Sequence, residues 1–250
     1  TYAHELGRLH LEQTFPEEVT TECYENLTRD LAEKAIADAI QKGCNIIFTT
    51  TPEFVQASVQ AAIAHPEVKI LNCSLNTSHR YIRTYYARMY EAKFLMGAIA
   101  GAMAENGQLA YIADYPIFGT IANINAFALG AKMVNPRAQI YLEWSTLKDV
   151  DLGIAMDNVI KKGVTVVSGQ DMVIPEDASR YFGLYHIEKE GPRNLAMPLW
   201  HWGKFYEQLI RTIMDGTWKY DDNKDETKAI NYWWGLSAEV IDVIYSQNLP

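Results

Sequence analysis

The sequence predicts an α/β protein with two similar lobes, each a Rossmann-like, doubly wound sheet covered by helices. The first observation is an internal repeat, because residues 35–51 align with residues 155–171 at a constant offset of 120. The second is the order of elements, since both copies read as helix, proline turn, strand, helix ending in Lys-Gly, and strand. That order is typical of right-handed βαβ units in a parallel sheet. A chain of 250 residues supplies about 120 residues for each lobe, enough to bury a core.

Composition and charge exclude several functional classes. The chain has 31 acidic and 22 basic residues, a formal net charge of -9, and no basic cluster larger than Lys161-Lys162. We therefore expect no nucleic-acid partner, because such proteins neutralise phosphates with clustered lysine and arginine. The longest strongly apolar stretch, residues 94–104, is much shorter than the roughly 20 residues that cross a bilayer. The sequence thus predicts a globular chain without a membrane span.

The first copy of the repeat begins with a helix from about Tyr2, followed by a strand-like run over 19–24. A second helix is predicted over 28–41, where apolar residues share one face and Gly43 ends the helix. The next run, residues 44–50, is short, apolar and rich in β-branched residues, as expected of a strand buried on both faces.

The second copy repeats this order after a buried strand over 108–113. A helix is predicted from about residue 119 to residue 134, and Asn135-Pro136 stops it because the residue before a proline disfavours the helical conformation. Further strands are predicted over 139–144 and 164–167.

The repeat also predicts an element that this chain lacks. In the second copy the strand over 108–113 precedes the helix from about 119, whereas the matching helix of the first copy starts at about Tyr2. We therefore expect the first strand of lobe one to lie before Thr1, because a doubly wound sheet without it leaves backbone groups unpaired.

Cysteine and histidine spacing indicates no metal site. The three cysteines, Cys23, Cys44 and Cys73, form no CxxC pair and lie in β-like runs, so we expect buried free thiols. The six histidines show no spacing typical of metal ligands. No G-x-S-x-G elbow, GxxxxGK[ST] loop or HExxH motif occurs, so the sequence predicts neither a catalytic centre nor a cofactor.

Ligands of open parallel sheets bind beyond the carboxyl ends of the strands, so the repeat predicts one such locus in each lobe and a ligand cleft between them. The candidates combine aromatic faces with hydroxyl, amide and carboxylate groups, which suits a flat, uncharged or cationic ligand and disfavours phosphate. They are Tyr24, Thr50 and Thr51 in lobe one, and Asp114, Tyr115, Phe118, Trp144, Gln170 and Asp171 in lobe two. The alternative interpretations are structural. The threonines and Asp114 could cap helices, and Tyr24 and Trp144 could lie at the surface.

A second aromatic concentration lies at residues 199–206, which lead from a strand-like run into a helix that ends at Gly216. Either Trp200 or Trp202 stacks on a bound ring, or the segment is a hydrophobic anchor between the lobes. For the β-like run 232–244 beyond it, core packing is the expected role of the aromatic residues.

Several long segments resemble the basic membrane protein family of solute-binding lipoproteins. They are RMYEAKFLMGA over 88–98, INAFALGA over 124–131 with VNP over 134–136, and WHWGKFY over 200–206 with DGTWK over 215–219. The resemblance implies a type I periplasmic-binding-protein fold with two lobes joined by three crossovers. It also implies an ABC importer with its permease as partner, an extracytoplasmic location through a lipid anchor absent from this chain, and a purine nucleoside or purine base as ligand.

The resemblance carries part of the family's site onto this sequence. The matching positions are Tyr2 and His4 for the N-terminal loop, Thr50 and Thr51 for the lobe-one loop, and Gly169, Gln170 and Asp171 for the lobe-two loop. The acidic residue that grips ribose is expected near 184–186, where no carboxylate is present. A lysine of nucleoside-binding relatives corresponds to Trp200, in a Trp-x-Trp-Gly pattern associated with free-base binding. We therefore predict a purine base such as adenine rather than a nucleoside.

The expected lobes are residues 1–106 with about 200–218, and residues 107–199 with about 229–250. Hinges are then expected near 105–108, 194–200 and 216–232, and closure of the lobes over the ligand would signal occupancy to a membrane partner. We expect a monomer. The alternative is a ligand-sensing domain of a larger regulatory or signalling protein that uses the same cleft, since unpaired cysteines are unusual in exported proteins.

Overall fold

The computed structural model describes residues 2–77, 79–147, 149–171, 180–218, 229–247 and 249. The chain forms two compact units: unit 1 contains Thr1–Ala87 and His201–Val240, and unit 2 contains Arg88–Trp200 and Ile241–Pro250. It therefore passes between the units three times, after Ala87, Trp200 and Val240. These positions differ from the lobe boundary expected near 106 and from the hinges expected near 105–108 and 216–232. Residues 219–228 of the last segment lie outside the described residues.

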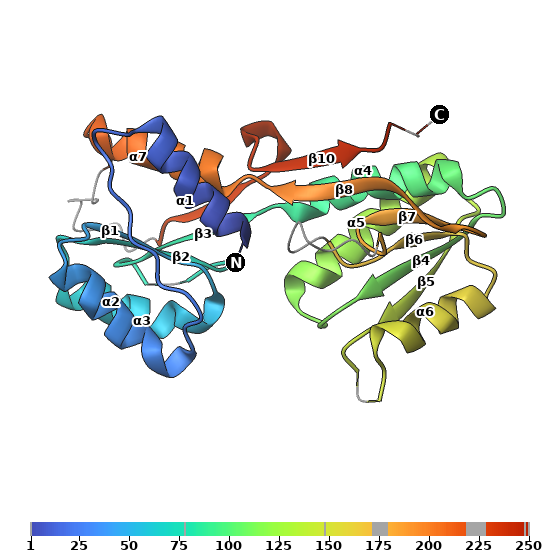
Figure 1. The fold of residues 1–250 in the computed structure, drawn as a ribbon, viewed down its shortest axis with the longest axis horizontal. Coiled ribbons are helices and arrows are strands. Elements are labelled where there is room, and N and C mark those ends of the chain that lie inside the picture. The colour runs from blue at the N-terminus through green and yellow to red at the C-terminus, as the bar shows by residue number, and fades with distance from the viewer. Residues whose placement is uncertain are drawn as a thin grey trace. The chain divides into compact units, whose positions relative to one another are not determined.

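Unit 1 is a parallel sheet with helices on both faces (Figure 1). Its strands follow the order β1 (Ile46–Thr49), β2 (Lys69–Cys73), β3 (Arg83–Ala87) and β9 (Asn231–Trp234). One face carries α1 (Tyr2–Thr14) and α7 (Trp202–Met214), and the other carries α2 (Ala32–Gln41) and α3 (Val55–Ala64). Short 3-10 turns are η1 (Arg29–Leu31), η2 (Pro52–Phe54) and η3 (Leu236–Ala238).

The core of unit 1 consists of an apolar layer on each face of the sheet. Ile36 of α2, Val59 of α3 and Ile70 of β2 belong to one buried cluster. On the opposite face Tyr85 of β3 stacks on Phe205 of α7, with ring centroids 4.8 Å apart. Helices α2 and α7 end close to the predicted positions because the glycines that follow them take the left-handed conformation favoured at helix ends.

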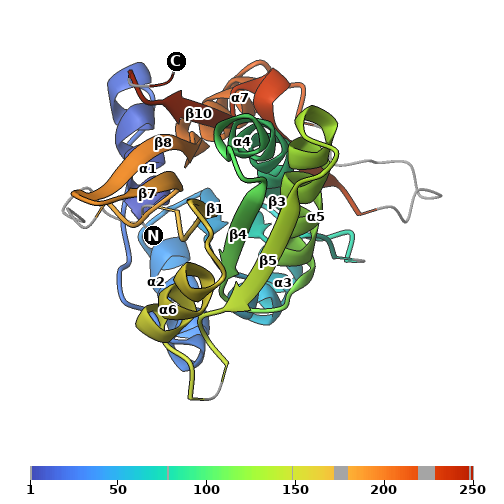
Figure 2. The same cartoon turned by 90° about the vertical axis from the view of Figure 1, so that its right-hand side faces the viewer.

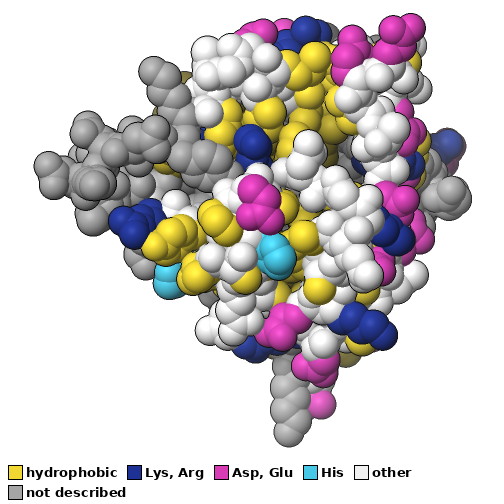
Figure 3. Space-filling view, turned by 90° about the vertical axis from the view of Figure 1, so that its left-hand side faces the viewer, with side chains coloured by type: hydrophobic (Ala, Val, Ile, Leu, Met, Phe, Trp, Pro, Cys, Tyr) yellow, Lys and Arg dark blue, Asp and Glu magenta, His cyan; other side chains and the backbone are white. Residues whose placement is uncertain are grey.

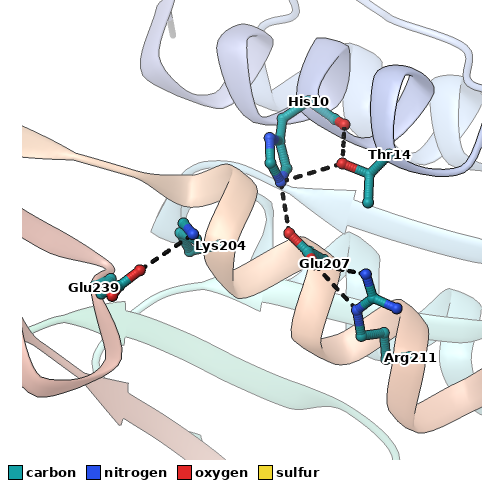
Figure 4. A network of polar contacts seen from close by, with 6 residues as sticks. All are labelled: His10, Thr14, Lys204, Glu207, Arg211 and Glu239. Carbon is teal, nitrogen blue, oxygen red and sulfur yellow. Dashed lines mark hydrogen bonds and ion pairs between the residues drawn. The ribbon is translucent and has the colours of Figure 1, made fainter.

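A polar network ties α1 to α7 on the surface of unit 1 (Figure 4). Nε2 of His10 lies 2.7 Å from a carboxylate oxygen of Glu207, and Arg211 pairs with the same carboxylate at 2.8 Å. These two partners lower the pKa of Glu207. A side chain at Gly203 would place its Cβ 2.8 Å from Cβ of His10, so the glycine permits this close approach of the two helices.

Unit 2 contains a mixed sheet (Figures 1 and 2). Its strands follow the order β10 (Ile241–Tyr245), β8 (Gly191–Trp200), β7 (Leu184–Glu188), β6 (Val166–Ser168), β4 (Gln108–Ala113) and β5 (Gln139–Trp144). The parallel arrangement expected from the repeat extends over β5, β4 and β6 only, whereas β7, β8 and β10 are antiparallel to their neighbours. The connection between β7 and β8 is too short for a crossover, so this pair must be antiparallel.

Helices α4 (Met89–Met103) and α5 (Phe118–Val134) cover one face of the unit 2 sheet, and α6 (Leu152–Lys161) covers the other (Figure 2). Glycines bring α4 and α5 into backbone contact. A Cβ at Gly97 would lie 2.0 Å from the carbonyl oxygen of Phe127, and one at Gly130 would lie 2.0 Å from that of Phe94. Because α4 packs on α5 and on β6, β8 and β10, the second unit begins at Arg88 rather than near residue 107.

The strand predicted over 19–24 does not form, which corrects the sequence analysis. Its counterpart in the repeat is β5, whose partner in the sheet is β4. Among the described residues of unit 1, no strand takes the place that β4 has between β5 and β6. The run 19–24 therefore has no neighbouring strand with which its backbone groups can pair.

The prediction of buried thiols is wrong for Cys23, which is exposed because it lies in this unpaired run. Cys44 and Cys73 are half-buried, and desolvation raises the pKa of Cys73 to about 12, so its thiol stays protonated.

The described ranges contain no helix with both the length and the apolar character needed to cross a membrane. They also contain no cluster of three or more histidine, cysteine or acidic side chains that could hold a metal ion. On the molecular face drawn in Figure 3, acidic and basic side chains are interspersed, and the described side chains form no continuous basic patch.

Candidate functional site

In unit 1, hydroxyl and amide side chains gather at the carboxyl ends of β1 and β2. Asn72 is fully buried, and its Nδ2 donates to Oγ1 of Thr49 and to the carbonyl of Thr51, at 2.8 Å in each case. Oγ1 of Thr49 also shares a hydrogen bond of 2.9 Å with Oγ of Ser58 on α3. These bonds hold the loop that carries Thr50 and Thr51 against the neighbouring strand.

The orientation of the Asn72 amide follows from its partners. The carbonyl of Thr51 can only accept a hydrogen bond, so the amide nitrogen faces it and Oδ1 faces away. Among the described residues, neither Oδ1 of Asn72 nor the buried hydroxyl of Ser74 has a hydrogen-bond partner. Sequence analysis missed both residues, although they flank Cys73 in a β-like run, and this place is a signal that could have identified them.

Thr51 and Tyr24, two of the lobe-one candidates, make contacts that differ from each other. Thr51 caps η2 by accepting a hydrogen bond of 3.4 Å from the backbone N–H of Glu53, as the capping alternative states. Tyr24 donates to Asp38 of α2 at 2.6 Å, and the Lys42 ammonium lies over its ring. Because Asp38 is in the last turn of α2, just before β1 begins, Tyr24 lies toward the amino end of the sheet. The structure therefore does not bring Tyr24 to the predicted site.

His4 and Trp202 pack against each other in the interior of unit 1. Their rings stack with centroids 4.7 Å apart and an interplanar angle of 10°. Nδ1 of His4 lies 2.6 Å from the hydroxyl of Tyr206, and burial lowers the pKa of His4 to about 3, so the imidazole is neutral. The imidazole thus covers a face of the indole that was a candidate for a bound ring, whereas Tyr2 is exposed.

In unit 2, three parallel strands end at one edge of the sheet. The register pairs Ala113 of β4 with Trp144 of β5, while β6 ends at Ser168. Because the ends of parallel neighbours meet, Asp114, Trp144 and the loop 169–171 lie along this edge. Strand β8 runs in the same direction as β6, since two antiparallel steps separate them. Through Leu184, its Ala196 is level with Ser168, so β8 continues past this edge to Trp200.

Asp114 anchors the loop that leads from β4 into α5. Its Oδ1 accepts hydrogen bonds from the backbone N–H of Tyr115 at 2.7 Å and from Oγ1 of Thr120 at 3.2 Å. The side chains of Tyr115 on this loop and of Phe118, the first residue of α5, are exposed. The carboxylate therefore has a local structural role and stands beside two accessible aromatic rings.

The loop 169–171 is held by backbone hydrogen bonds. The N–H of Gly169 donates to the carbonyl of Gly183 at 2.8 Å, and the N–H of Gly183 donates to the carbonyl of Gln170 at 2.7 Å. The Gln170 side chain is exposed, whereas Asp171 is half-buried. Residues 172–179 beyond it lie outside the described residues. The bonds place Asp171 firmly at the carboxyl end of β6.

A buried lysine that sequence analysis missed reaches this edge from α4. The Lys93 side chain is 2% exposed, and its Nζ lies 2.6 Å from Oδ1 of Asp171, whose side chain is 15% exposed. The ammonium also lies 5.7 Å from the ring centre of Tyr111 on β4. Burial alone lowers the pKa of Lys93, but the attraction of Asp171, together with Tyr111 and Asp114, outweighs burial and raises it. The lysine is therefore charged.

The sequence does carry a signal for this residue. Lys93 lies on the face of α4 that also presents Met89, Met96 and Ala100, all of them buried. A single charge in an apolar helical stripe requires a counter-charge, because an unpaired buried ammonium is strongly unfavourable. The identity of the counter-charge cannot be read from the helix itself.

Three similarities to known proteins bear on this arrangement. The family described as "ABC transporter substrate-binding protein PnrA-like" matches residues 1–176. A purine-binding protein of Brucella abortus (strain 2308) is 26% identical over 264 residues, which covers 100% of this chain and 72% of that protein. A putative ABC transporter glucose-binding protein of Haloferax volcanii is 25% identical over 250 residues, covering 96% of this chain and 61% of that protein.

The fold is shared with solved structures. An ABC transporter solute-binding protein from Conexibacter woesei DSM 14684 matches with a TM-score of 0.75 and 12% identity, over 100% of this chain and 85% of that chain. The predicted fold class is thus confirmed, and the fold is that of type I periplasmic binding proteins.

Proposed function

The chain belongs to the PnrA-like substrate-binding proteins of ABC transporters, and from this membership we propose that it captures a purine, with free adenine favoured over a nucleoside. It is a solute-binding protein and not an enzyme. Its proposed partner is the permease of an importer, and its proposed location is the outer side of the cell membrane, held there by a lipid anchor. The proposed working form is a monomer.

The observation that carries this proposal is the carboxyl edge of unit 2. Two carboxylates, Asp114 and Asp171, lie on the same edge as the aromatic residue Trp144. A purine offers N–H groups and ring nitrogens on its perimeter and an aromatic face for stacking. Carboxylates accept the N–H groups, and stacking contributes about 0.5–1.5 kcal/mol beyond burial. The purine-binding name of the Brucella relative supports the same ligand class.

Unit 1 is proposed to complete the site. Thr50 and Thr51 supply hydroxyl groups that both donate and accept, and Asn72 holds their loop in place. We propose that the bound purine receives contacts from both units and that closure occurs about the three passages of the chain. Binding energy then favours the closed state only when the ligand contacts both units.

Strand β7 supports the proposed preference for a free base over a nucleoside. Ribose recognition needs acceptors for adjacent hydroxyl groups, commonly a carboxylate. The strand that the family resemblance indicates for it presents Leu184 and Tyr185 to the core instead. A free base also keeps the ring N–H that a nucleoside replaces with its sugar, and so provides one more donor for a carboxylate.

Isothermal titration calorimetry of the purified chain with adenine, adenosine, hypoxanthine and glucose tests the proposal. Adenine is expected to bind most tightly. Trp144→Ala is expected to weaken adenine binding about tenfold, the value of one lost stacking contact. Leu142→Ala, on the same strand, is the matched control and leaves the affinity unchanged. A chain that binds none of the purines would refute the proposal.

A sugar is the second candidate ligand, because the Haloferax relative carries a glucose-binding name and matches nearly the whole chain. Aromatic faces and carboxylates also suit hydroxyl-rich rings. Glucose binding without purine binding in the same titration would favour this candidate. The signalling alternative is separated from transport by purine uptake: cells that lose the protein also lose uptake if it serves an importer, and keep it if it serves a sensor.

A further inference from the structure

We propose that Lys93 is a positioning residue that holds Asp171 as an acceptor-only carboxylate, so that the site selects ligands which present an N–H group at this point. The favoured ligands are purines that carry an amino group at this point, as adenine does. Purines that carry a carbonyl there, as hypoxanthine does, are disfavoured. This inference rests on the proposed function and names its specificity determinant.

The two ends of the ion pair lie in different surroundings. Lys93 is enclosed in the interior of unit 2, where α4 packs against β6 and β8, and its side chain is 2% exposed. Asp171 lies just beyond the end of β6 and retains 15% of its side-chain exposure. The pair therefore connects the interior with the edge, and its accessible end is the carboxylate.

The hydrogen bonds leave capacity on that carboxylate. Nζ of Lys93 donates to Oδ1 at 2.6 Å. From the described residues, no other hydrogen bond reaches the carboxylate of Asp171. A carboxylate has two oxygens with about four acceptor positions, so it can accept further N–H groups while it stays bound to the lysine. A carboxylate has no proton to donate to a carbonyl.

Stability alone does not account for this pair. A buried ion pair often contributes no more than well-packed apolar side chains of similar size, because both charges lose their hydration. The Asp171 carboxylate, moreover, lies at the same edge of the sheet as Asp114 and Trp144. A lysine that neutralises part of this charge also keeps two nearby carboxylates compatible with an uncharged ligand.

Calorimetry of the full chain with adenine and hypoxanthine tests the inference through a double-mutant cycle. Lys93→Met is expected to weaken adenine binding about tenfold and to bring the adenine-to-hypoxanthine affinity ratio toward one. Asp171→Asn is expected to lower the same ratio further, because its amide can donate to a carbonyl. The double variant should bind no more weakly than the weaker single variant, since both changes remove one interaction. Lys93→Arg should keep most of the ratio.

Lys162→Met is the matched control, because Lys162 also lies over a tyrosine ring in unit 2, that of Tyr141, but is exposed. It should leave both affinities unchanged. An unchanged ratio in Lys93→Met, or additive effects in the double variant, would overturn the inference. Adenine binding by the original chain would still support the proposed function in that case. If the original chain binds no purine, both fall. If Lys93→Met does not fold, judged by circular dichroism, Asp171→Asn decides: an unchanged ratio overturns the inference.

Discussion

The carboxyl edges of the two units occupy equivalent places in the repeat but differ in chemistry. At matching positions, unit 1 has Thr51 and unit 2 has Asp171. The unit 1 edge is built from neutral groups that bond to one another, with Asn72 at the centre. The unit 2 edge is built from carboxylates, one of them paired with the buried Lys93. The repeat therefore preserved the backbone position of these loops, while the two halves diverged in the hydrogen bonds that their side chains can donate and accept.

The largest expected effect concerns how tightly each unit packs its helices. Gly97→Ala in unit 2 would place a Cβ against the backbone of Phe127, whereas in unit 1 the Cβ of Gly7→Ala would first meet the ring of Tyr206. We expect Gly97→Ala to lower the free energy of unfolding by about 3 kcal/mol or more, and Gly7→Ala to lower it by less. Both replacements gain the same helix propensity, so the difference in urea denaturation reports packing. Equal losses would contradict this comparison.

The next effect concerns the buried amide at the unit 1 edge. Asn72→Ala removes two buried hydrogen bonds, to Oγ1 of Thr49 and to the carbonyl of Thr51, which keeps the bond from the N–H of Phe54. We therefore expect a loss of about 2–3 kcal/mol in the free energy of unfolding. Asn106→Ala in unit 2 is the control, because Asn106 also donates to a carbonyl, that of Gly163, but at an exposed position. Its loss should be under about 1 kcal/mol. Similar losses for the two variants would show that burial does not set the cost.

The smallest effect concerns the loss of stability at acid pH that the buried, neutral His4 of unit 1 causes. The pKa of His4 is about 3 in the folded chain against an ordinary value of 6.5. The unfolded chain therefore binds the extra proton between these values, so the contribution to stability is complete above pH 6.5 and is lost as the pH falls toward 3. The loss between pH 7 and pH 5 is about 2 kcal/mol.

Urea denaturation of His4→Gln at pH 7 and pH 5 measures this contribution. Glutamine keeps a polar group beside Tyr206 but does not titrate, so the variant should lose less stability on acidification than the original chain. His79→Gln, at an exposed position, should behave like the original chain. An identical pH dependence in His4→Gln would show that His4 does not carry the effect.

Much of the fold could be predicted because it depends on local patterns. β4, α5 and β5 lie where hydrophobic periodicity and turn residues indicated, and α7 ends just before Gly216. The run 19–24 failed because a strand needs a partner, and partner strands are not a local property. The same reason explains the exposure of Cys23 and the position of Tyr24 beside α2.

The sequence by itself determined the repeat, the two α/β halves and the edge of each sheet where polar residues follow the strands. Each of these features depends on residues that lie close together along the chain. Only the tertiary structure decided that α4 belongs to unit 2, that His4 covers Trp202, and that Lys93 meets Asp171. The last two partners are 78 positions apart in the chain. Such pairs depend on how helices pack on a sheet, and the packing is set by long-range contacts such as the glycines between α4 and α5 rather than by any local pattern.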